Sequence, residues 1–342
     1  MLSSSTHDTK RGEDTRARLA LLGEAAEEWI QHVAVWSRIL RARDSGSGHS
    51  APPERNDEYA FYQLLFGAWP PELATGGPPD PAETDAFRMR LEGAMVKAMR
   101  EAKVHTTWVA PDAAYEDAVL AFIRYALDAS RTNRFLESFA SFATRFAPLG
   151  MRNSLVQAVL KLTVPGVPDI YQGAEIWDFS LVDPDNRRPV NFELRCELLD
   201  RLAEPNDLAE LMDKWQDGRI TLRIVSDLLQ LRRQYPDLFA AGSYAPLSAT
   251  GLANERICAF ARAGNQATIV VAASLYPVRA SLEGWGESAL PVPEGEGDRW
   301  VNLLDSKKLR ACAGAISAAE LFQILRVAVL VPERISVPRA EG

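Results

Sequence analysis

Apolar residues recur every three or four positions through most of the first 235 residues, which predicts a series of amphipathic helices. The stripe over 14–40 predicts one or two helices, with a break around Gly23. Further stripes predict helices around 87–99, 119–127, 135–146, 153–164 and 219–235. We expect the phenylalanines of the 135–146 stripe to lie in a core rather than to form a binding platform.

Between and after these helices the pattern changes. Stretches rich in Ser, Gly and Pro predict loops at 43–57 and 74–85. The segment PGVPDIYQG predicts a turn and a short buried strand, which a long polar loop follows. Beyond Phe239, short apolar runs alternate with loops, which predicts a small antiparallel β-sandwich. The expected fold class is therefore α/β followed by an all-β part.

Composition narrows the possible partners. The chain has 342 residues, 47% of them hydrophobic, which is enough to bury real cores. A formal net charge of −8 with interspersed signs argues against nucleic-acid binding. No apolar stretch approaches the length of a bilayer span, so we expect a soluble, cytoplasmic protein with no membrane partner. Three widely spaced cysteines predict buried thiols rather than disulfides or a zinc site.

The polar loop that follows the predicted strand is rich in carboxylates, amides, aromatic rings and guanidinium groups. Such groups hydrogen-bond sugar hydroxyls and stack on the apolar faces of sugars. The candidate sugar-binding residues are Tyr171, Gln172, Glu175, Asp183, Asp185, Asn186, Arg187 and Arg188. A calcium loop beginning at Asp183 fails, because the required Gly and Glu positions hold Arg188 and Leu194. A purely structural role, in which the arginines pair with the aspartates, remains open.

A second reactive-looking stretch, STHDTKRGED, holds His7, Asp8, Lys10 and Arg11. Asp8 or Thr9 could cap a helix, or His7 and Asp8 could bind a metal. The chain has 4 histidines without ligand spacing, which disfavours the metal. Dinucleotide, P-loop and serine-hydrolase motifs are absent from the sequence. We therefore expect neither a cofactor nor a metal.

Several blocks of the chain resemble the maltooligosyl trehalose synthase family, in the α-amylase clan of glycoside hydrolases. They are STHDTKRGEDTRAR, RNDEYAFYQLLFGAWP, KVHTTWVAPDAAYEDAV and LKLTVPGVPDIYQGAEIWDFSLVDPDNRRPVNFE. They occur in the family's order, and the resemblance runs from about residue 3 to the C-terminus. The last block is the most specific of them.

The resemblance implies only the C-terminal part of a (β/α)8 barrel enzyme, with chemistry at the carboxyl ends of the strands. It places the end of strand seven at 1–12, a large helical insertion at 13–150, and strand eight with its substrate loop and last barrel helix at 151–238. The C-terminal β-sandwich domain would occupy 239–342. The chain would thus begin at the seventh strand, and strands one to six would be missing.

The same resemblance implies an isomerase of trehalose biosynthesis, which converts the reducing-end α-1,4 bond of a maltodextrin into an α,α-1,1 bond. Asp8 matches the family's third carboxylate, which stabilises the transition state. His7 would bind a sugar hydroxyl, and Lys10 and Arg11 would line the reducing-end subsites. The family's nucleophile and general acid/base come from strands four and five, so we expect this chain to be inactive alone.

The expected partners are a maltooligosaccharide substrate and a separate N-terminal half that carries strands one to six. Two alternatives to a split enzyme remain: a non-catalytic maltodextrin-binding fragment, and a gene remnant without a function of its own. Unpaired barrel strands would expose edges and apolar faces, so a remnant would aggregate or unfold in part.

Overall fold

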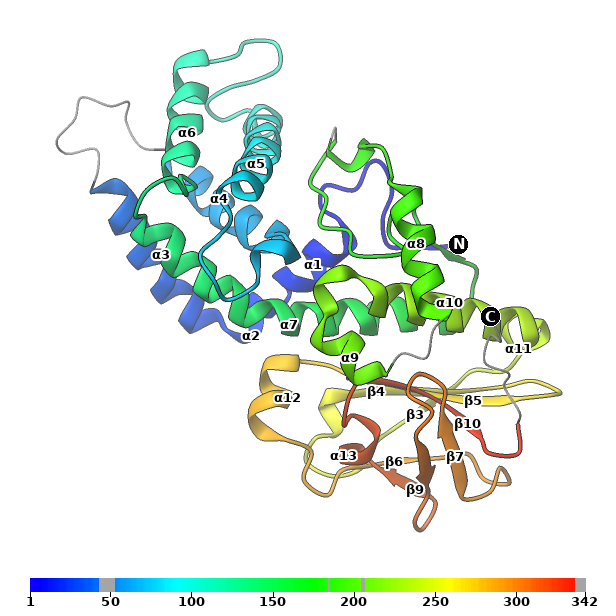
Figure 1. Cartoon of the computed structure of the whole chain (residues 1–342). Helices are drawn as coiled ribbons and strands as arrows, with labels where there is room; N and C mark the ends of the chain where they lie inside the picture. The colour runs from blue at the N-terminus through cyan, green and yellow to red at the C-terminus, as the bar shows by residue number, and fades with distance from the viewer. Residues whose placement is uncertain (43–52, 184, 204–206, 336–342) are drawn as a thin grey trace. The chain divides into compact units, whose positions relative to one another are not determined.

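A computed structural model describes residues 1–42, 53–183, 185–203 and 207–335 (Figure 1). The chain divides into two compact units. The helical unit consists of Thr6–Gly150 and Asp178–Pro189, and the mixed unit consists of Met1–Ser5, Met151–Trp177 and Val190–Gly342. The four-part division expected from the sequence remains a prediction.

The helical unit begins with three helices where one or two were expected. They are α1 (Glu13–Leu19), α2 (Leu21–Glu24) and α3 (Ala26–Arg41). The expected break around Gly23 is confirmed to within two residues, because α2, which contains Gly23, ends at Glu24. Ala25, with a φ of −113° and a ψ of 31°, leaves the helical region and separates α2 from α3.

The remaining helices of this unit follow the predicted stripes. They are α4 (Arg55–Ala68), the 3-10 turn η1 (Pro71–Leu73), α5 (Pro81–Ala102), α6 (Ala113–Ala126), the first part of α7 (Arg134–Thr163), and the 3-10 turn η2 (Asp185–Arg187). The loop expected over 43–57 ends earlier than predicted, because α4 already begins at Arg55; residues 43–52 lie outside the described residues. Glu54 starts α4 by accepting a hydrogen bond of 3.1 Å from the backbone N–H of Asn56.

Local sequence explains the start of α5 and the core behind it. Asp80 accepts hydrogen bonds of 2.9 Å from the N–H groups of Ala82 and Glu83, and Pro81 occupies the first helical position, where no donor is needed. The expected aromatic core is confirmed: Phe135, Phe139, Phe142 and Phe146 are all buried. The ring of Trp36 lies 5.4 Å from that of Phe139.

Helix α7 is one continuous helix of 30 residues, although the sequence predicts separate helices around 135–146 and 153–164. It contains Pro148 and Gly150, which normally interrupt a helix. Apolar residues before and after this point, such as Phe146 and Met151, are buried. Their tertiary packing stabilises a continuous helix despite the proline and the glycine.

The mixed unit contains a short parallel pair of strands, β1 (Leu2–Ser3) and β2 (Pro168–Asp169). Leu2 is paired with Pro168, and Ser3 with Asp169. The unit also contains the end of α7 and these helical segments: α8 (Phe192–Ala203), α9 (Leu208–Asp213), the 3-10 turn η3 (Trp215–Asp217), α10 (Arg219–Gln234) and α11 (Pro236–Ala240). Helix α10 confirms the predicted helix at 219–235.

The expected change to short antiparallel strands beyond Phe239 is confirmed. A six-stranded antiparallel sheet has the order β3 (Ala245–Leu247), β4 (Ile257–Ala263), β5 (Thr268–Ser274), β10 (Val327–Pro332), β7 (Arg299–Asn302) and β8 (Lys308–Arg310). A second, two-stranded sheet joins β6 (Ala289–Pro291) to β9 (Ala315–Ser317). Figure 1 shows these strands gathered together, with the short helices α12 (Pro277–Glu283) and α13 (Ala318–Leu321) beside them.

Both sheets contribute to one hydrophobic core, which includes Trp300 and Leu330 of the larger sheet and Leu290 and Ile316 of the smaller one. The description of this part as a sandwich remains a prediction. The expectation of buried thiols is wrong, because Cys196, Cys258 and Cys312 are free and exposed. Cys258 occupies an outward position of β4, where side chains alternate between the two faces. None of the described helices combines the length and the apolar character needed to cross a membrane.

Candidate functional site

The turn that carries Asp8 lies in the helical unit, before α1. Thr6 and Thr9 close it: the Thr6 N–H donates to the Thr9 hydroxyl at 2.8 Å, and the Thr9 N–H donates to the Thr6 carbonyl at 3.1 Å. The side chain of Asp8 is 81% exposed. Its carboxylate lies 3.3 Å from Nε2 of His7, so these two groups form one polar pair on the surface of the unit. The turn presents Asp8 rather than using it as a helix cap, because α1 begins at Glu13.

The loop at 178–189 is hydrogen-bonded to the backbone of this turn. Its Asn186 donates two hydrogen bonds through Nδ2, at 2.9 Å to the carbonyl oxygen of His7 and at 3.2 Å to that of Thr9. Asp8 therefore sits between two anchored carbonyl groups. Further along, the Gly12 N–H donates to the Ser180 carbonyl at 2.8 Å. The structure thus brings His7, Asp8 and Asn186 together.

Asp185 is held by partners within the helical unit, so the expectation that it contacts sugar remains a prediction beside this pairing. Only 7% of its side chain is exposed, and Arg90 of α5 binds it through Nε at 2.8 Å and Nη2 at 3.0 Å. The backbone N–H of Leu181 also donates to it at 2.7 Å. Burial acts to raise the pKa of Asp185, but the hydrogen bonds and charge of Arg90 outweigh it and hold that pKa below its ordinary value.

The other charged residues of the loop also form ion pairs, so the bracing role left open by the sequence is present in the structure. Nε of Arg187 lies 2.5 Å from Asp183, and Nε of Arg188 lies 2.9 Å from Asp185. Both arginine side chains remain more than half exposed, at 54% and 55%. A role in sugar binding for Asp183, Arg187 and Arg188 therefore remains a prediction beside their pairing.

The two basic residues after Asp8 differ in their surroundings. Lys10 donates to Glu101 of α5 at 2.7 Å, and this hydrogen bond holds the pKa of Glu101 below its usual range. Arg11 is half-buried, and burial lowers its pKa. Its Nε is buried without a hydrogen-bond partner among the described residues. Lys10 is thus paired with Glu101, whereas the Nε of Arg11 has no acceptor among the described residues.

Tyr171, Gln172 and Glu175 lie in the mixed unit, whereas Asp8 lies in the helical unit. Tyr171 begins a turn in which its carbonyl accepts from the Ala174 N–H at 2.9 Å. Glu175 accepts from Nε of Arg195 at 3.0 Å, and Arg195 also donates to the Gly173 carbonyl at 2.6 Å. Glu175 is therefore partly engaged in holding its own loop to α8.

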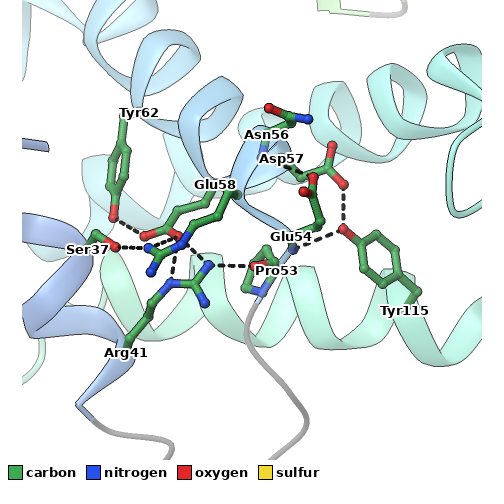
Figure 2. Close-up of polar contacts among 10 residues, drawn as sticks. Ser37, Arg41, Pro53, Glu54, Asn56, Asp57, Glu58, Tyr62 and Tyr115 are labelled. Carbon is green, nitrogen blue, oxygen red and sulfur yellow. Dashed lines mark hydrogen bonds and ion pairs between the residues drawn. The ribbon is translucent and has the colours of Figure 1, made fainter. Parts of the chain in front are cut away.

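A second polar cluster lies between α3 and α4, and sequence reasoning missed it. Figure 2 shows Glu58 surrounded by donors. Its carboxylate accepts from Nε of Arg41 at 2.7 Å, from the Tyr62 hydroxyl at 2.9 Å and from Arg55 at 3.3 Å. Burial acts to raise the pKa of Glu58, but hydrogen bonds with Arg41, Ser37 and Tyr62, with Arg41 foremost, bring it below its ordinary value. We assign this cluster a structural role, because only 2% of the Glu58 side chain is exposed.

The partners Arg90, Arg41 and Arg195 had no signal in the sequence, because each meets its acid only after folding.

Within the described ranges, no group of three or more His, Cys, Asp or Glu side chains is arranged to hold a metal ion. The turn offers an exposed carboxylate beside an imidazole, on backbone that the Asn186 loop fixes. Such a group can accept hydrogen bonds from hydroxyls or stabilise a developing positive charge.

Comparisons with known proteins give one consistent answer. Two curated relatives from Mycobacterium tuberculosis strains, whose name of maltooligosyl trehalose synthase is provisional, are each 34% identical to the chain over 331 residues. The match covers 97% of this chain and 37% of each relative. The chain therefore spans little more than a third of the relatives' length. No protein-family model matches it.

Solved structures agree. A maltooligosyltrehalose synthase from Arthrobacter ramosus matches with a TM-score of 0.76 and 35% identity, over 96% of this chain and 38% of that one. A hypothetical maltooligosyl trehalose synthase from Sulfolobus tokodaii matches with a TM-score of 0.71 and 30% identity, over 96% and 38%. Sequence and fold thus agree over nearly the whole chain. The chain belongs to the maltooligosyl trehalose synthase family, and it corresponds to a part of its members rather than to their whole length.

Proposed function

We propose that this chain is the C-terminal part of a glucan isomerase that converts the reducing-end α-1,4 bond of a maltodextrin into an α,α-1,1 bond. The observation that carries the proposal is the 34% identity over 97% of the chain to relatives named as maltooligosyl trehalose synthases. The parallel pair β1 and β2 supports it, because adjacent parallel strands are what strands seven and eight of a barrel would form.

The proposed reaction needs three carboxyl groups. A carboxylate nucleophile attacks C1 of the penultimate glucose, while a carboxylic acid protonates the leaving O4 of the last glucose. The last glucose then turns, and its C1 hydroxyl attacks the glycosyl-enzyme and gives up its proton to the same acid/base. No water is consumed, and the reducing end is lost.

We assign the third carboxyl group to Asp8. An exposed carboxylate on a fixed turn fits a group that stabilises the oxocarbenium-like transition state without attacking it. His7 would bind a neighbouring hydroxyl, and Lys10 and Arg11 would contact the glucose units on the reducing side. The other proposed substrate contacts are Tyr171, Gln172, Glu175, Asp183, Asp185, Asn186, Arg187 and Arg188. The nucleophile and the acid/base would come from the part of the family members' length that this chain does not match. A second polypeptide would supply that part.

The test is the loss of reducing ends from maltohexaose. The chain alone should give none, and the chain mixed with a polypeptide covering the rest of the barrel should give loss of reducing power without free glucose. If the two polypeptides form a stable complex and reducing power is unchanged, the proposed isomerase function is wrong. Binding of maltohexaose without turnover in that complex would instead identify a non-catalytic binding fragment.

A further inference from the structure

Arg18 of helix α1 is a buried cation of the helical unit that has no part in the site described above. Only 1% of the residue is exposed. Burial lowers its pKa to about 9, while the charge of Asp14 acts in the opposite direction, so the guanidinium stays charged at neutral pH. A buried charge costs free energy unless the fold uses it, so the contacts of this guanidinium need an explanation.

The guanidinium of Arg18 joins the end of helix α4 to the loop at 178–189. Its Nη1 donates to the carbonyl oxygens of Trp69 at 2.5 Å and Phe66 at 3.5 Å, at the carboxyl end of α4, where carbonyl groups lack partners within the helix. Its Cζ lies 4.0 Å from the centre of the Phe179 ring in the loop. Nε and Nη2 are buried without a hydrogen-bond partner among the described residues. The charge is thus used on α4 and on the loop.

Asp14, one turn before Arg18 on α1, holds the neighbouring residue of the loop. Its Oδ2 accepts a hydrogen bond of 2.5 Å from the backbone N–H of Asp178. Side chains four positions apart lie on the same face of a helix. One face of α1 therefore holds Asp178 and Phe179, two successive residues of the loop.

Helix α7 restrains the stem of the Arg18 side chain. A Cβ added at Gly150 would lie 3.0 Å from Cγ of Arg18 and 3.1 Å from its Cβ. Both distances are shorter than the ordinary carbon–carbon contact of about 3.5 to 4.0 Å. The close approach of α7 to Arg18 therefore requires glycine at position 150, and it leaves the arginine little room to move away from the loop.

The restraint on the start of the loop reaches Asp8 through Asn186. Leu181, two residues after Phe179, donates its backbone N–H to the carboxylate of Asp185 at 2.7 Å, which connects the start of the loop to the residue before Asn186. Asn186 in turn donates to the carbonyl groups on both sides of Asp8. A continuous series of contacts thus runs from Arg18 to the Asp8 turn.

We propose that Arg18 is a positioning residue for Asp8, which it keeps in the arrangement that the reaction needs by holding Phe179 and, through the loop, Asn186. The inference rests on the proposed function, in which Asp8 stabilises the transition state. A carboxylate that is fixed before the reaction needs no reorganisation when charge develops. A loosened Asp8 turn should therefore slow the reaction more than it weakens substrate binding.

The first test is hydrogen–deuterium exchange of the chain alone. Arg18→Met removes the charge and the planar group but keeps a long apolar side chain, and it should accelerate amide exchange over residues 6–12 by about tenfold. Arg262→Met is the matched control. Arg262 is also 1% exposed, also has a buried Nε without a partner among the described residues, and also lies near a phenylalanine ring, but it belongs to the mixed unit. Its variant should leave exchange over residues 6–12 within about twofold.

The second test is the rate of maltohexaose isomerisation by the two-polypeptide mixture. Arg18→Met should lower kcat by about tenfold and leave KM within about twofold, because an interaction of the transition state is weakened. The rate is expressed per folded chain, with the folded fraction measured by urea unfolding, so a loss of stability alone would leave it unchanged. Arg262→Met should keep the full rate per folded chain.

The third test is the combination of Arg18→Met with Asn186→Ala. If Arg18 acts on Asp8 through Asn186, Arg18→Met should lower kcat by less than about twofold when Asn186→Ala is already present, because effects that share one route do not multiply. A further loss of about tenfold would show independent effects and would overturn the proposed route.

Two other results would overturn the inference. One is exchange over residues 6–12 that is no faster in Arg18→Met than in Arg262→Met, and the other is an unchanged kcat per folded chain. If Arg18→Met fails to fold, Phe179→Leu, which removes the ring beside the guanidinium, takes its place in both measurements. Faster exchange and a lower kcat in that variant support the inference, and unchanged values overturn it.

The inference and the proposed function fail in different ways. If the mixture isomerises maltohexaose and Arg18→Met changes neither exchange nor kcat, only the role of Arg18 is wrong. If exchange over residues 6–12 depends on Arg18 but the assembled mixture forms no isomerised product, Arg18 holds the Asp8 turn and the isomerase function is wrong.

Discussion

The side-chain amide of Asn186 donates a hydrogen bond of 2.9 Å to the carbonyl oxygen of His7. These residues are 179 positions apart, and the same amide also holds the Thr9 carbonyl at 3.2 Å. The backbone is thus fixed on both sides of Asp8. A carboxylate that stabilises a transition state must be held in place before the reaction, and Asn186 provides part of that restraint.

Asn186→Ala should loosen the Asp8 turn. Two hydrogen bonds are lost, so we expect the free energy of unfolding of the helical unit to fall by about 1 to 2 kcal/mol and amide exchange over residues 6–12 to accelerate. Hydrogen–deuterium exchange and urea unfolding measure the two effects. Asn56→Ala, an exposed residue at the start of α4, should change neither. Equal exchange in both variants would show that Asn186 does not restrain the turn.

Gly12→Ala should push the loop at 178–189 away from the segment that carries Asp8, because the added methyl group would clash with Asp178. An added Cβ would lie 2.3 Å from the carbonyl oxygen of Asp178, so the backbone must shift at a cost of about 1 to 3 kcal/mol. Gly23→Ala is the matched control: its Cβ would meet no atom within 4 Å, and alanine in a helix should stabilise by about 0.5 to 1 kcal/mol. Urea unfolding of both variants should give shifts of opposite sign, and shifts of the same sign would contradict the packing described.

Asp185→Asn should destabilise the chain at neutral pH by about 3 kcal/mol, because it leaves Arg90 without its buried counter-charge. The folded pKa of Asp185 lies below its unfolded value of about 3.9. The stability that the charged carboxylate contributes is therefore present above pH 4 and is lost as the pH falls through the folded pKa. Urea unfolding at pH 7 and in increasingly acidic buffers should show a shrinking difference between wild type and variant. A constant difference would mean that the pair does not stabilise the fold through charge.

Helices with a strong stripe were predictable from the sequence, and single contacts across the chain were not. The apolar positions of α5, α6 and α10 recur at helical spacing, and the predicted apolar faces are buried. The continuity of α7 was missed, because Pro148 and Gly150 are local signals that tertiary packing overrides. At the start of the chain the break around Gly23 was predictable, but the earlier division between α1 and α2 at Ala20 had no glycine or proline to mark it.

In the candidate site too, contacts between residues far apart in the sequence could not be predicted. The residue types around Asp8 and in the 178–189 loop indicated sugar chemistry, but not which residues the protein uses for itself. The pairing of Asp185 could not be predicted, because its partner Arg90 is 95 positions away in the sequence. Arg11 looked equivalent to Lys10, and only the structure separates a paired lysine from an arginine whose Nε has no partner in the part of the chain that the structure describes.

The most direct measurement is the loss of reducing ends from maltohexaose by the two-polypeptide mixture, with Asp8→Asn compared with Asp213→Asn. Asp213 is an exposed carboxylate at the end of α9, so its variant should retain full activity. We predict that Asp8→Asn lowers the rate by about 100-fold or more, because the carboxylate that stabilises the transition state is gone. An unchanged rate with Asp8→Asn would contradict the assignment of Asp8 and the role proposed for this chain.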